Sequence, residues 1–371
     1  MSVQETLAKS GPRKLLALDG GGVRGVMTLE VLLHIESTLQ QLLGSGDDFV
    51  LADYFDYVAG TSTGAIIATC LALGMRVKSI RELYHNAARE MFDRTHGLSR
   101  LRSKYAGTHL TRLLRDEIGL DATLGSDRLQ TLLMLVMRNA TTDSPWPVSN
   151  NPRAMFNALD SAASNLRFPL WQLVRASTAA PTYFPPEVID VGGQQFVFVD
   201  GGVTVYNNPA FQLFLMATIE PYRLCWTATK ESMLLVSVGS GIAARSNEKL
   251  RPKKMSLLYD AVSVPAALIF SATQEQDFLC RVFGDCLVGD EVDAEVGDMR
   301  EARGPLDRKL FTYLRYNADL SAVGLARLGL PDIDSAAVQA LDASLHIEEL
   351  CRIGACVARQ VNPEHYTPFG P

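Results

Sequence analysis

A serine between two glycines is the first feature of this sequence that could perform chemistry. Ser62 lies in the pattern Gly60-x-Ser-x-Gly64, which is typical of a serine nucleophile on a sharp turn between a strand and a helix. Residues 54–59 form a short apolar run that predicts a buried strand, and residues 65–73 predict a buried helix. Ser62 is therefore a candidate nucleophile, and a Cβ at either glycine would collide with the adjoining strand or helix. The alternative is a glycine–serine turn without a catalytic role.

A glycine-rich loop follows the apolar strand predicted over residues 14–18. Its residues Gly20, Gly21 and Gly22 precede an amphipathic segment that predicts a helix ending near Leu43. The N–H groups of such a loop, with the N-terminus of the following helix, form an anion site.

Three kinds of anion site compete for this loop. A dinucleotide-binding fingerprint has the right glycine spacing, but no acidic residue ends a second strand about 20 residues later. A P-loop requires a Gly-Lys-Ser/Thr ending, which is absent. The third interpretation is an oxyanion hole, in which glycine amides stabilise the negative charge that develops on a carbonyl oxygen.

Asp200 is a candidate partner of the serine. It ends the apolar strand predicted over residues 195–199, and it precedes Gly201 and Gly202. In α/β sheets, active-site side chains lie at the carboxyl ends of strands. An Asp–Gly turn without a catalytic role is the alternative.

A serine hydroxyl attacks an ester only when a base accepts its proton. The usual base is a histidine oriented by a carboxylate, and Ser62, Asp200 and either His346 or His365 occur in the order found in α/β-hydrolases. However, none of the six histidines directly follows a convincing core strand. The alternative is a dyad in which Asp200 itself accepts the proton. This requires burial to raise a carboxyl pKa that is normally about 4.

Composition places the chain among ordinary globular proteins. Its 371 residues are 47% apolar and 20% charged, and the net charge of −6 gives no reason to expect a nucleic acid polymer as partner. Six cysteines without a Cys-x-x-Cys pair indicate neither a zinc site nor a disulfide framework, which favours a reducing, cytoplasmic compartment. The segment at 155–159 resembles a further strand, and the small residues around Ser177 are interpreted as packing residues.

Any membrane contact of this chain is expected to be peripheral. The polar residues 1–13 do not resemble a signal peptide. No apolar run approaches the ~18–20 residues that span a bilayer. A basic segment at 92–109 is either a solvated loop or a flap that meets anionic lipid headgroups.

Four blocks of the sequence, taken together, resemble the patatin-like phospholipases. The blocks are Asp19-Gly-Gly-Gly-x-Arg-Gly25, Gly60-x-Ser-x-Gly64, Ala176-Ser-x-x-Ala-Pro181 and Asp200-Gly-Gly202. The first block adds Arg24 and Gly25 to the motif residues, and residues 313–317 (Tyr-Leu-Arg-Tyr-Asn) extend the likeness toward plant patatins. The resemblance implies an α/β three-layer sandwich with a mostly parallel central sheet and helices on both faces. Without a repeat or a clear linker, we expect one domain over residues 1–371. Its catalytic blocks lie within 14–210, and a helical and loop extension covers about 245–371.

The resemblance also implies a reaction. It implies hydrolysis of acyl esters in membrane glycerophospholipids by a Ser62–Asp200 dyad through an acyl-enzyme. The oxyanion donors would be Gly20, Gly21 and Gly22, with no metal and no cofactor. We expect a cytoplasmic enzyme that acts at the membrane surface. In some bacterial members of the family a cyclic nucleotide activates phospholipid degradation in antiphage defence, so such an activator is part of the expectation. An α/β-hydrolase-type esterase with a histidine base and a Rossmann-type nucleotide-binding protein are the alternatives.

Overall fold

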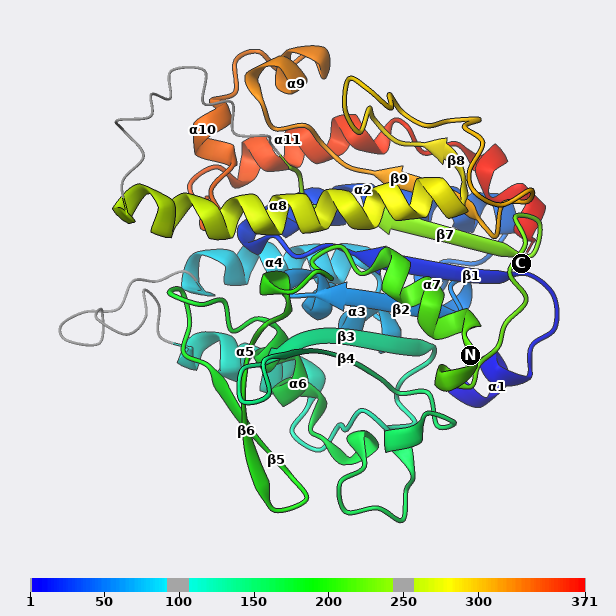
Figure 1. Ribbon diagram of the computed structural model, residues 1–371, viewed down its shortest axis with the longest axis vertical. Helices are drawn as coiled ribbons and strands as arrows, with labels where there is room; N and C mark the ends of the chain where they lie inside the picture. Colours follow the sequence, from blue (N-terminus) through cyan, green and yellow to red (C-terminus); the bar gives the residue numbers. More distant parts are fainter. Residues whose placement is uncertain (1, 92–106, 243–256, 371) are drawn as a thin grey trace.

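The computed structural model is built around one sheet, which contains nine strands in the part of the chain that it describes (Figure 1). The structure describes residues 2–91, 107–242 and 257–370, so the basic segment predicted at 92–109 lies almost entirely outside them. The order of neighbouring strands is β5 (Glu187–Val191), β6 (Gln194–Asp200), β3 (Leu132–Asn139), β2 (Tyr57–Thr61), β1 (Arg13–Leu18), β7 (Met233–Val238), β9 (Thr312–Tyr316) and β8 (Asp285–Val288), and β4 (Ser144–Ser149) also pairs with β3.

The sheet is mostly parallel. The six strands from β3 to β8 along this order pair in parallel, whereas β4, β5 and β6 pair antiparallel. Every residue of β1, β2, β7 and β9 is buried. A parallel strand covered on both faces reads as a continuous apolar run rather than as an alternating pattern, which is why β1 and β2 are visible in the sequence, whereas β9, which contains Arg315, was not predicted as a strand.

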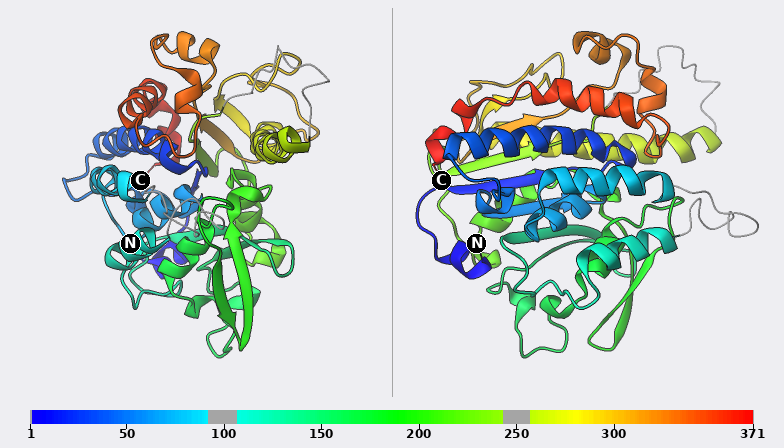
Figure 2. Two further views of the ribbon diagram at one scale, coloured as in Figure 1. Left: turned by 90° about the vertical axis from the view of Figure 1, so that its left-hand side faces the viewer. Right: turned by 180° about the vertical axis from the view of Figure 1, so that it is seen from behind.

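Helices cover both faces of the sheet (Figure 2). Leu16 and Leu18 of β1 belong to one hydrophobic core, and Leu15 and Ala17 belong to the other, because successive strand residues point to opposite faces. The first core is shared with α2 (Gly25–Leu43), α3 (Thr63–Ala72), α4 (Val77–Met91), α5 (Thr108–Ile118), α6 (Leu170–Ser177) and α11 (Ile347–Ala358). The second core is shared with α7 (Ala210–Thr218) and α8 (Leu257–Phe283). The predicted three-layer α/β sandwich is confirmed.

The C-terminal third of the chain is part of these layers. It supplies strands β8 and β9, and α11 packs along α2. The short helices α1 (Val3–Ala8), α9 (Ala322–Arg327) and α10 (Ser335–Val338) lie at the periphery (Figure 1).

One predicted strand is wrong. The segment at 155–159 contains a single 3₁₀ turn, Met155–Asn157, and its Met155, Phe156 and Leu159 side chains are exposed. A short apolar run forms a strand only where a neighbouring strand can pair with it, and residues 155–159 pair with none of the described strands.

Candidate active site

Ser62 lies on the turn that joins β2 to α3. Its backbone angles, φ 55° and ψ −124°, are values that a residue with a side chain rarely adopts. This is the strained turn expected of a serine nucleophile. A Cβ at Gly60 would collide with the backbone of Gly64, and a Cβ at Gly64 would collide with the carbonyl oxygen of Leu18. Both glycines therefore meet the steric requirement that the sequence predicts.

The C-terminal ends of β2 and β6 meet along one edge of β3. β4 pairs with β3 over the whole of residues 134–139 and occupies one edge. β2 and β6 pair with successive parts of β3 and therefore share the other edge. β2 runs parallel to β3 and β6 antiparallel, so Thr61 lies opposite Val136 and Asp200 lies opposite the next residue, Met137. This register brings Asp200 beside the serine that follows Thr61.

The two side chains are hydrogen-bonded. Ser62 Oγ donates a bond of 2.6 Å to Asp200 Oδ2, and the amide of Gly202 donates a bond of 2.6 Å to Asp200 Oδ1. Asp200 is only 4% exposed. Burial raises the pKa of Asp200 to about 6, although the bonds from Ser62 and Gly202 and the charge of Arg175 act in the opposite direction. A carboxylate with this pKa is ionised at neutral pH and is a stronger base than an ordinary one.

Histidine does not take part in this pair within the described residues. No histidine among them is hydrogen-bonded to Ser62 or Asp200. His346 lies at the start of α11, where its Nδ1 is 3.3 Å from Glu349 Oε1. His365 lies in a 3₁₀ turn near the C-terminus. The geometry therefore favours the two-residue arrangement over the histidine alternative.

The glycine loop between β1 and α2 lies against the turn that carries Ser62. The amide of Gly20 donates to the carbonyl of Asn207 at 3.1 Å. The amide of Gly21 donates to Thr63 Oγ1 at 3.2 Å. Within the described ranges, the amide of Gly22 has no acceptor at hydrogen-bond distance. Of the three predicted donors, Gly21 and Gly22 are thus the ones with an amide that is weakly engaged or available.

Arg24 and Tyr84 hold the next peptides of the loop. Arg24 Nε donates to the carbonyl of Gly21 at 3.3 Å. The carbonyl of Gly21 and the amide of Gly22 belong to one trans peptide and point in opposite directions, so this bond orients the Gly22 amide. Tyr84 donates a bond of 2.5 Å to the carbonyl of Gly22, and a Cβ at Gly25 would lie 3.1 Å from the same tyrosine hydroxyl.

Ser177, interpreted from the sequence as a packing residue, makes polar contacts at the end of α6. Its hydroxyl accepts a bond of 3.0 Å from the amide of Ser62 and donates one of 2.5 Å to the carbonyl of Val136. The side chain is fully buried. A Cβ at Gly201 would collide with the same carbonyl, so β3, the serine turn and the loop after Asp200 meet at this point.

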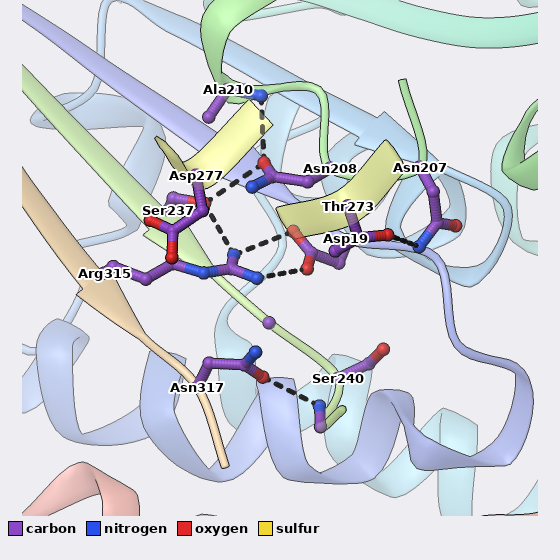
Figure 3. A network of polar contacts seen from close by, with 12 residues as sticks. Asp19, Asn207, Asn208, Ala210, Ser237, Ser240, Thr273, Asp277, Arg315 and Asn317 are labelled. Atoms are coloured by element: carbon purple, nitrogen blue, oxygen red, sulfur yellow. Dashed lines mark hydrogen bonds and ion pairs between the residues drawn. The ribbon is translucent and has the colours of Figure 1, made fainter. Parts of the chain in front are cut away.

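A buried ion pair adjoins the glycine loop (Figure 3). Arg315, from β9, donates to the two carboxylate oxygens of Asp19 at 2.9 and 2.6 Å, and donates a further bond of 2.7 Å to Ser237 Oγ. Both charged side chains are 2% exposed. Asp19 and Arg315 both lie in sequence motifs, but they are 296 positions apart and no local pattern pairs them. The only sequence feature that could have predicted the pair is the presence of two opposite charges at or next to buried strands.

One group of side chains elsewhere has the types that bind metal ions. Glu30, His85 and Cys351, from α2, α4 and α11, bring their ligand atoms within 4.8 Å of one another. Arg81 Nε donates a bond of 2.6 Å to Glu30. Because this guanidinium already balances the charge of the carboxylate, we assign no metal to the group.

Comparison with known proteins finds similarity to patatin-like proteins and phospholipases. The family model described as patatin-like phospholipase matches residues 16–214, which include the glycine loop, Ser62 and Asp200. The chain is 29% identical over 334 residues to patatin-like protein 1 of Arabidopsis thaliana, covering 74% of this chain and 75% of that protein. It is 28% identical over 227 residues to an intracellular phospholipase A2 of Caenorhabditis elegans, covering 60% of this chain and 19% of that protein. It is 29% identical over 212 residues to the cGAMP-activated phospholipase of Vibrio cholerae, covering 53% and 56%.

In the part of the chain that the structure describes, no helix combines the length and the apolar character needed to cross a bilayer.

The match to the family model spans more than half of the chain. The protein is a lipid acyl hydrolase and belongs to the patatin-like phospholipase family.

Proposed function

We propose that the protein cleaves carboxylic ester bonds of glycerophospholipids at a membrane surface, with Ser62 as nucleophile and Asp200 as its base. The observation that carries the proposal is the 2.6 Å hydrogen bond from Ser62 Oγ to Asp200 Oδ2, in a chain whose family hydrolyses lipids. A base must lie within hydrogen-bond reach of the proton that it removes, and Asp200 meets this condition without a histidine.

The reaction follows from this geometry in two halves. Asp200 accepts the proton of Ser62 as the serine oxygen attacks the ester carbonyl carbon, which gives a tetrahedral intermediate. When the intermediate collapses, the departing alcohol takes the proton from Asp200 and the acyl group stays on Ser62. Asp200 then accepts a proton from water, the water oxygen attacks the acyl-enzyme, and the fatty acid leaves as Ser62 recovers its proton.

We assign the oxyanion hole to the amides of Gly21 and Gly22. The Gly21 amide makes a long bond of 3.2 Å to the neutral hydroxyl of Thr63, and a charged oxygen is a stronger acceptor that can replace it. The amide of Gly20 is bonded to the carbonyl of Asn207, so we assign this glycine a steric role. A Cβ there would lie 3.1 Å from the Cβ of Ser62 and would crowd the substrate.

Membrane contact is proposed from residues near the site. Val203 and Val205 follow Asp200 by a few positions and are exposed. The exposed Arg112 and Arg115 line one cavity of about 580 Å³ together with the buried Arg175 and the acidic Asp116 and Glu187. Arg175 is close enough to Asp200 for its charge to lower the pKa of the carboxyl. Apolar and cationic side chains near a lipid hydrolase site suit acyl chains and anionic headgroups. We therefore propose a cytoplasmic enzyme of one domain that binds membranes peripherally.

The test is mass spectrometry of the products released from mixed phospholipid vesicles. The wild-type protein should release free fatty acids and lysophospholipids, and Ser62→Ala and Asp200→Asn should release neither while retaining the circular dichroism of the wild type. Equal release by wild type and Ser62→Ala would overturn the proposal. Sedimentation with vesicles of phosphatidylcholine, with and without phosphatidylglycerol, tests the membrane contact, because binding should increase with the anionic lipid.

Activation by a cyclic nucleotide is a second proposal, and it rests on the likeness to the cGAMP-activated phospholipase of Vibrio cholerae. The hydrolysis rate should rise when cyclic dinucleotides or trinucleotides are added to the purified protein. Equal rates with and without the whole panel of nucleotides would dispose of this proposal and leave the dyad untouched.

A further inference from the structure

We propose that Asp19 and Arg315 are positioning residues, which set the direction of the oxyanion-hole amides through a buried ion pair at the base of the glycine loop. The inference rests on the proposed function, because it assigns these residues to the same ester hydrolysis. Neither side chain is placed in contact with the substrate.

The sheet register explains why an arginine is needed at position 315. Ser237 of β7 lies opposite Ala17 of β1 on one side and opposite Arg315 of β9 on the other. Asp19 lies two residues beyond Ala17 and would face the same side of the sheet. Adjacent strands are about 4.8 Å apart, so the Arg315 side chain crosses β7 to reach Asp19. Figure 3 shows the guanidinium facing the carboxylate.

The ion pair has the properties of a rigid connection. The guanidinium binds both oxygens of Asp19 at 2.9 and 2.6 Å and also Ser237 Oγ at 2.7 Å. A bidentate arginine–carboxylate pair fixes orientation as well as distance. Both side chains are 2% exposed, so water cannot readily replace either partner, and loss of one partner leaves an uncompensated buried charge.

The connection continues from Asp19 into the loop. The amide of Asp19 donates to the carbonyl of Val238 at 3.1 Å, and Ser240 Oγ donates to the carbonyl of Gly20 at 2.7 Å. The carbonyl of Gly20 and the amide of Gly21 point in opposite directions across one trans peptide. The bond from Ser240 therefore aims the Gly21 amide away from β7 and toward Thr63 Oγ1, where it is found. This peptide starts at Gly20, the residue directly after Asp19, and Arg315 holds the Asp19 side chain.

Asp56 provides a matched control at the opposite end of the same strands. Its side chain is 1% exposed, and its carboxylate binds Lys9 Nζ at 3.0 Å and the amide of Lys14 at 2.8 Å. Asp56→Asn thus removes a buried, paired carboxylate near the start of β1 and β2, whereas Asp19→Asn removes one at the end of β1 that carries the glycine loop.

The experiment measures kcat and KM on phospholipid vesicles, together with the melting temperature, for Asp19→Asn, Arg315→Lys and Asp56→Asn. Asp19→Asn and Arg315→Lys should lower kcat by about 10²-fold, the loss caused by one missing oxyanion donor, with KM changed by less than about threefold. Asp56→Asn should lower the melting temperature and keep kcat within about threefold of the wild type. The pH at which the rate falls to half should be unchanged in all three, because the base is a different group.

Arg315→Lys keeps the positive charge and is the variant to read if Asp19→Asn does not fold. A lysine is a point charge without the planar fork, so it keeps the charge balance but not the orientation. Wild-type kcat in folded Arg315→Lys would overturn the inference, and so would an equal loss of kcat in Asp56→Asn. The proposed function fails separately, if Ser62→Ala retains activity.

Discussion

Ser62 and Asp200 are 138 positions apart in the sequence, and their side chains are joined by a hydrogen bond of 2.6 Å. The bond exists because β2 and β6 end at neighbouring residues along one edge of β3. The pair is held by backbone on both sides, through the strained turn at Ser62 and through the amide of Gly202. Such preorganisation is what a nucleophile and its base require.

Removal of either member of the pair should stop ester hydrolysis. We expect Ser62→Ala and Asp200→Asn each to lower kcat/KM by at least about 10³-fold, because the reaction then lacks its nucleophile or its base. The measurement is the initial rate of fatty acid release from vesicles, with a fluorophosphonate probe as a second readout. The probe should label the wild-type protein and not Ser62→Ala.

The histidines provide the matched control for the dyad. His346→Ala and His365→Ala should each retain a rate within about threefold of the wild type, because neither side chain is hydrogen-bonded to Ser62 or Asp200. A loss of activity in either variant comparable to that of Ser62→Ala would replace the dyad by a histidine-based triad.

The rate should depend on pH through the ionisation of Asp200. The carboxyl must be ionised to accept the serine proton, and burial raises its pKa to about 6. We therefore expect kcat/KM to be constant above this pH and to fall tenfold per unit well below it. A profile measured from pH 4.5 to 8.5 on neutral lipid would contradict the assignment if the rate fell only above pH 7.

Because burial raises its pKa to about 6, Asp200 lowers the free energy of unfolding at neutral pH relative to acidic pH. Between about pH 4 and 6 the folded protein binds a proton that the unfolded chain has released, so this group contributes stability that is lost as pH rises through about 6. Asp200→Asn does not titrate. Its free energy of unfolding relative to the wild type should increase by up to about 3 kcal/mol between pH 4 and pH 8. Urea unfolding at the two pH values measures this, and an unchanged difference would show that the carboxyl is not buried as described.

Ser177 should affect activity through the position of Ser62. Ser177→Ala leaves the amide of Ser62 and the carbonyl of Val136 without their partner, which should cost about 1–3 kcal/mol of stability and lower kcat by about tenfold through misplacement of the nucleophile. Thr178→Val is the control, because this buried neighbour bonds only to carbonyls of its own helix. Equal rates in the two variants would reduce Ser177 to a packing residue.

The sequence by itself determined the features that depend on neighbouring residues. The serine turn needs small residues at Gly60 and Gly64 because the backbone of β2, α3 and β1 passes within contact distance of them. Parallel strands buried on both faces are continuous apolar runs, so β1 and β2 could be predicted, and the antiparallel β6 was visible as the apolar run at 195–199. The segment at 155–159 was the exception, because an apolar run does not reveal whether a neighbouring strand exists.

Only the tertiary structure decided which of these features meet. The contact between Ser62 and Asp200 depends on the register of two strands against a third, and the pair Asp19–Arg315 joins residues 296 positions apart. The polar contacts of Ser177, and the bond that engages the Gly20 amide, also come from distant segments. A hydrogen bond or ion pair forms only when its two atoms lie within a range of distances a few tenths of an ångström wide. The packing of the whole sheet, rather than any local pattern, sets such distances.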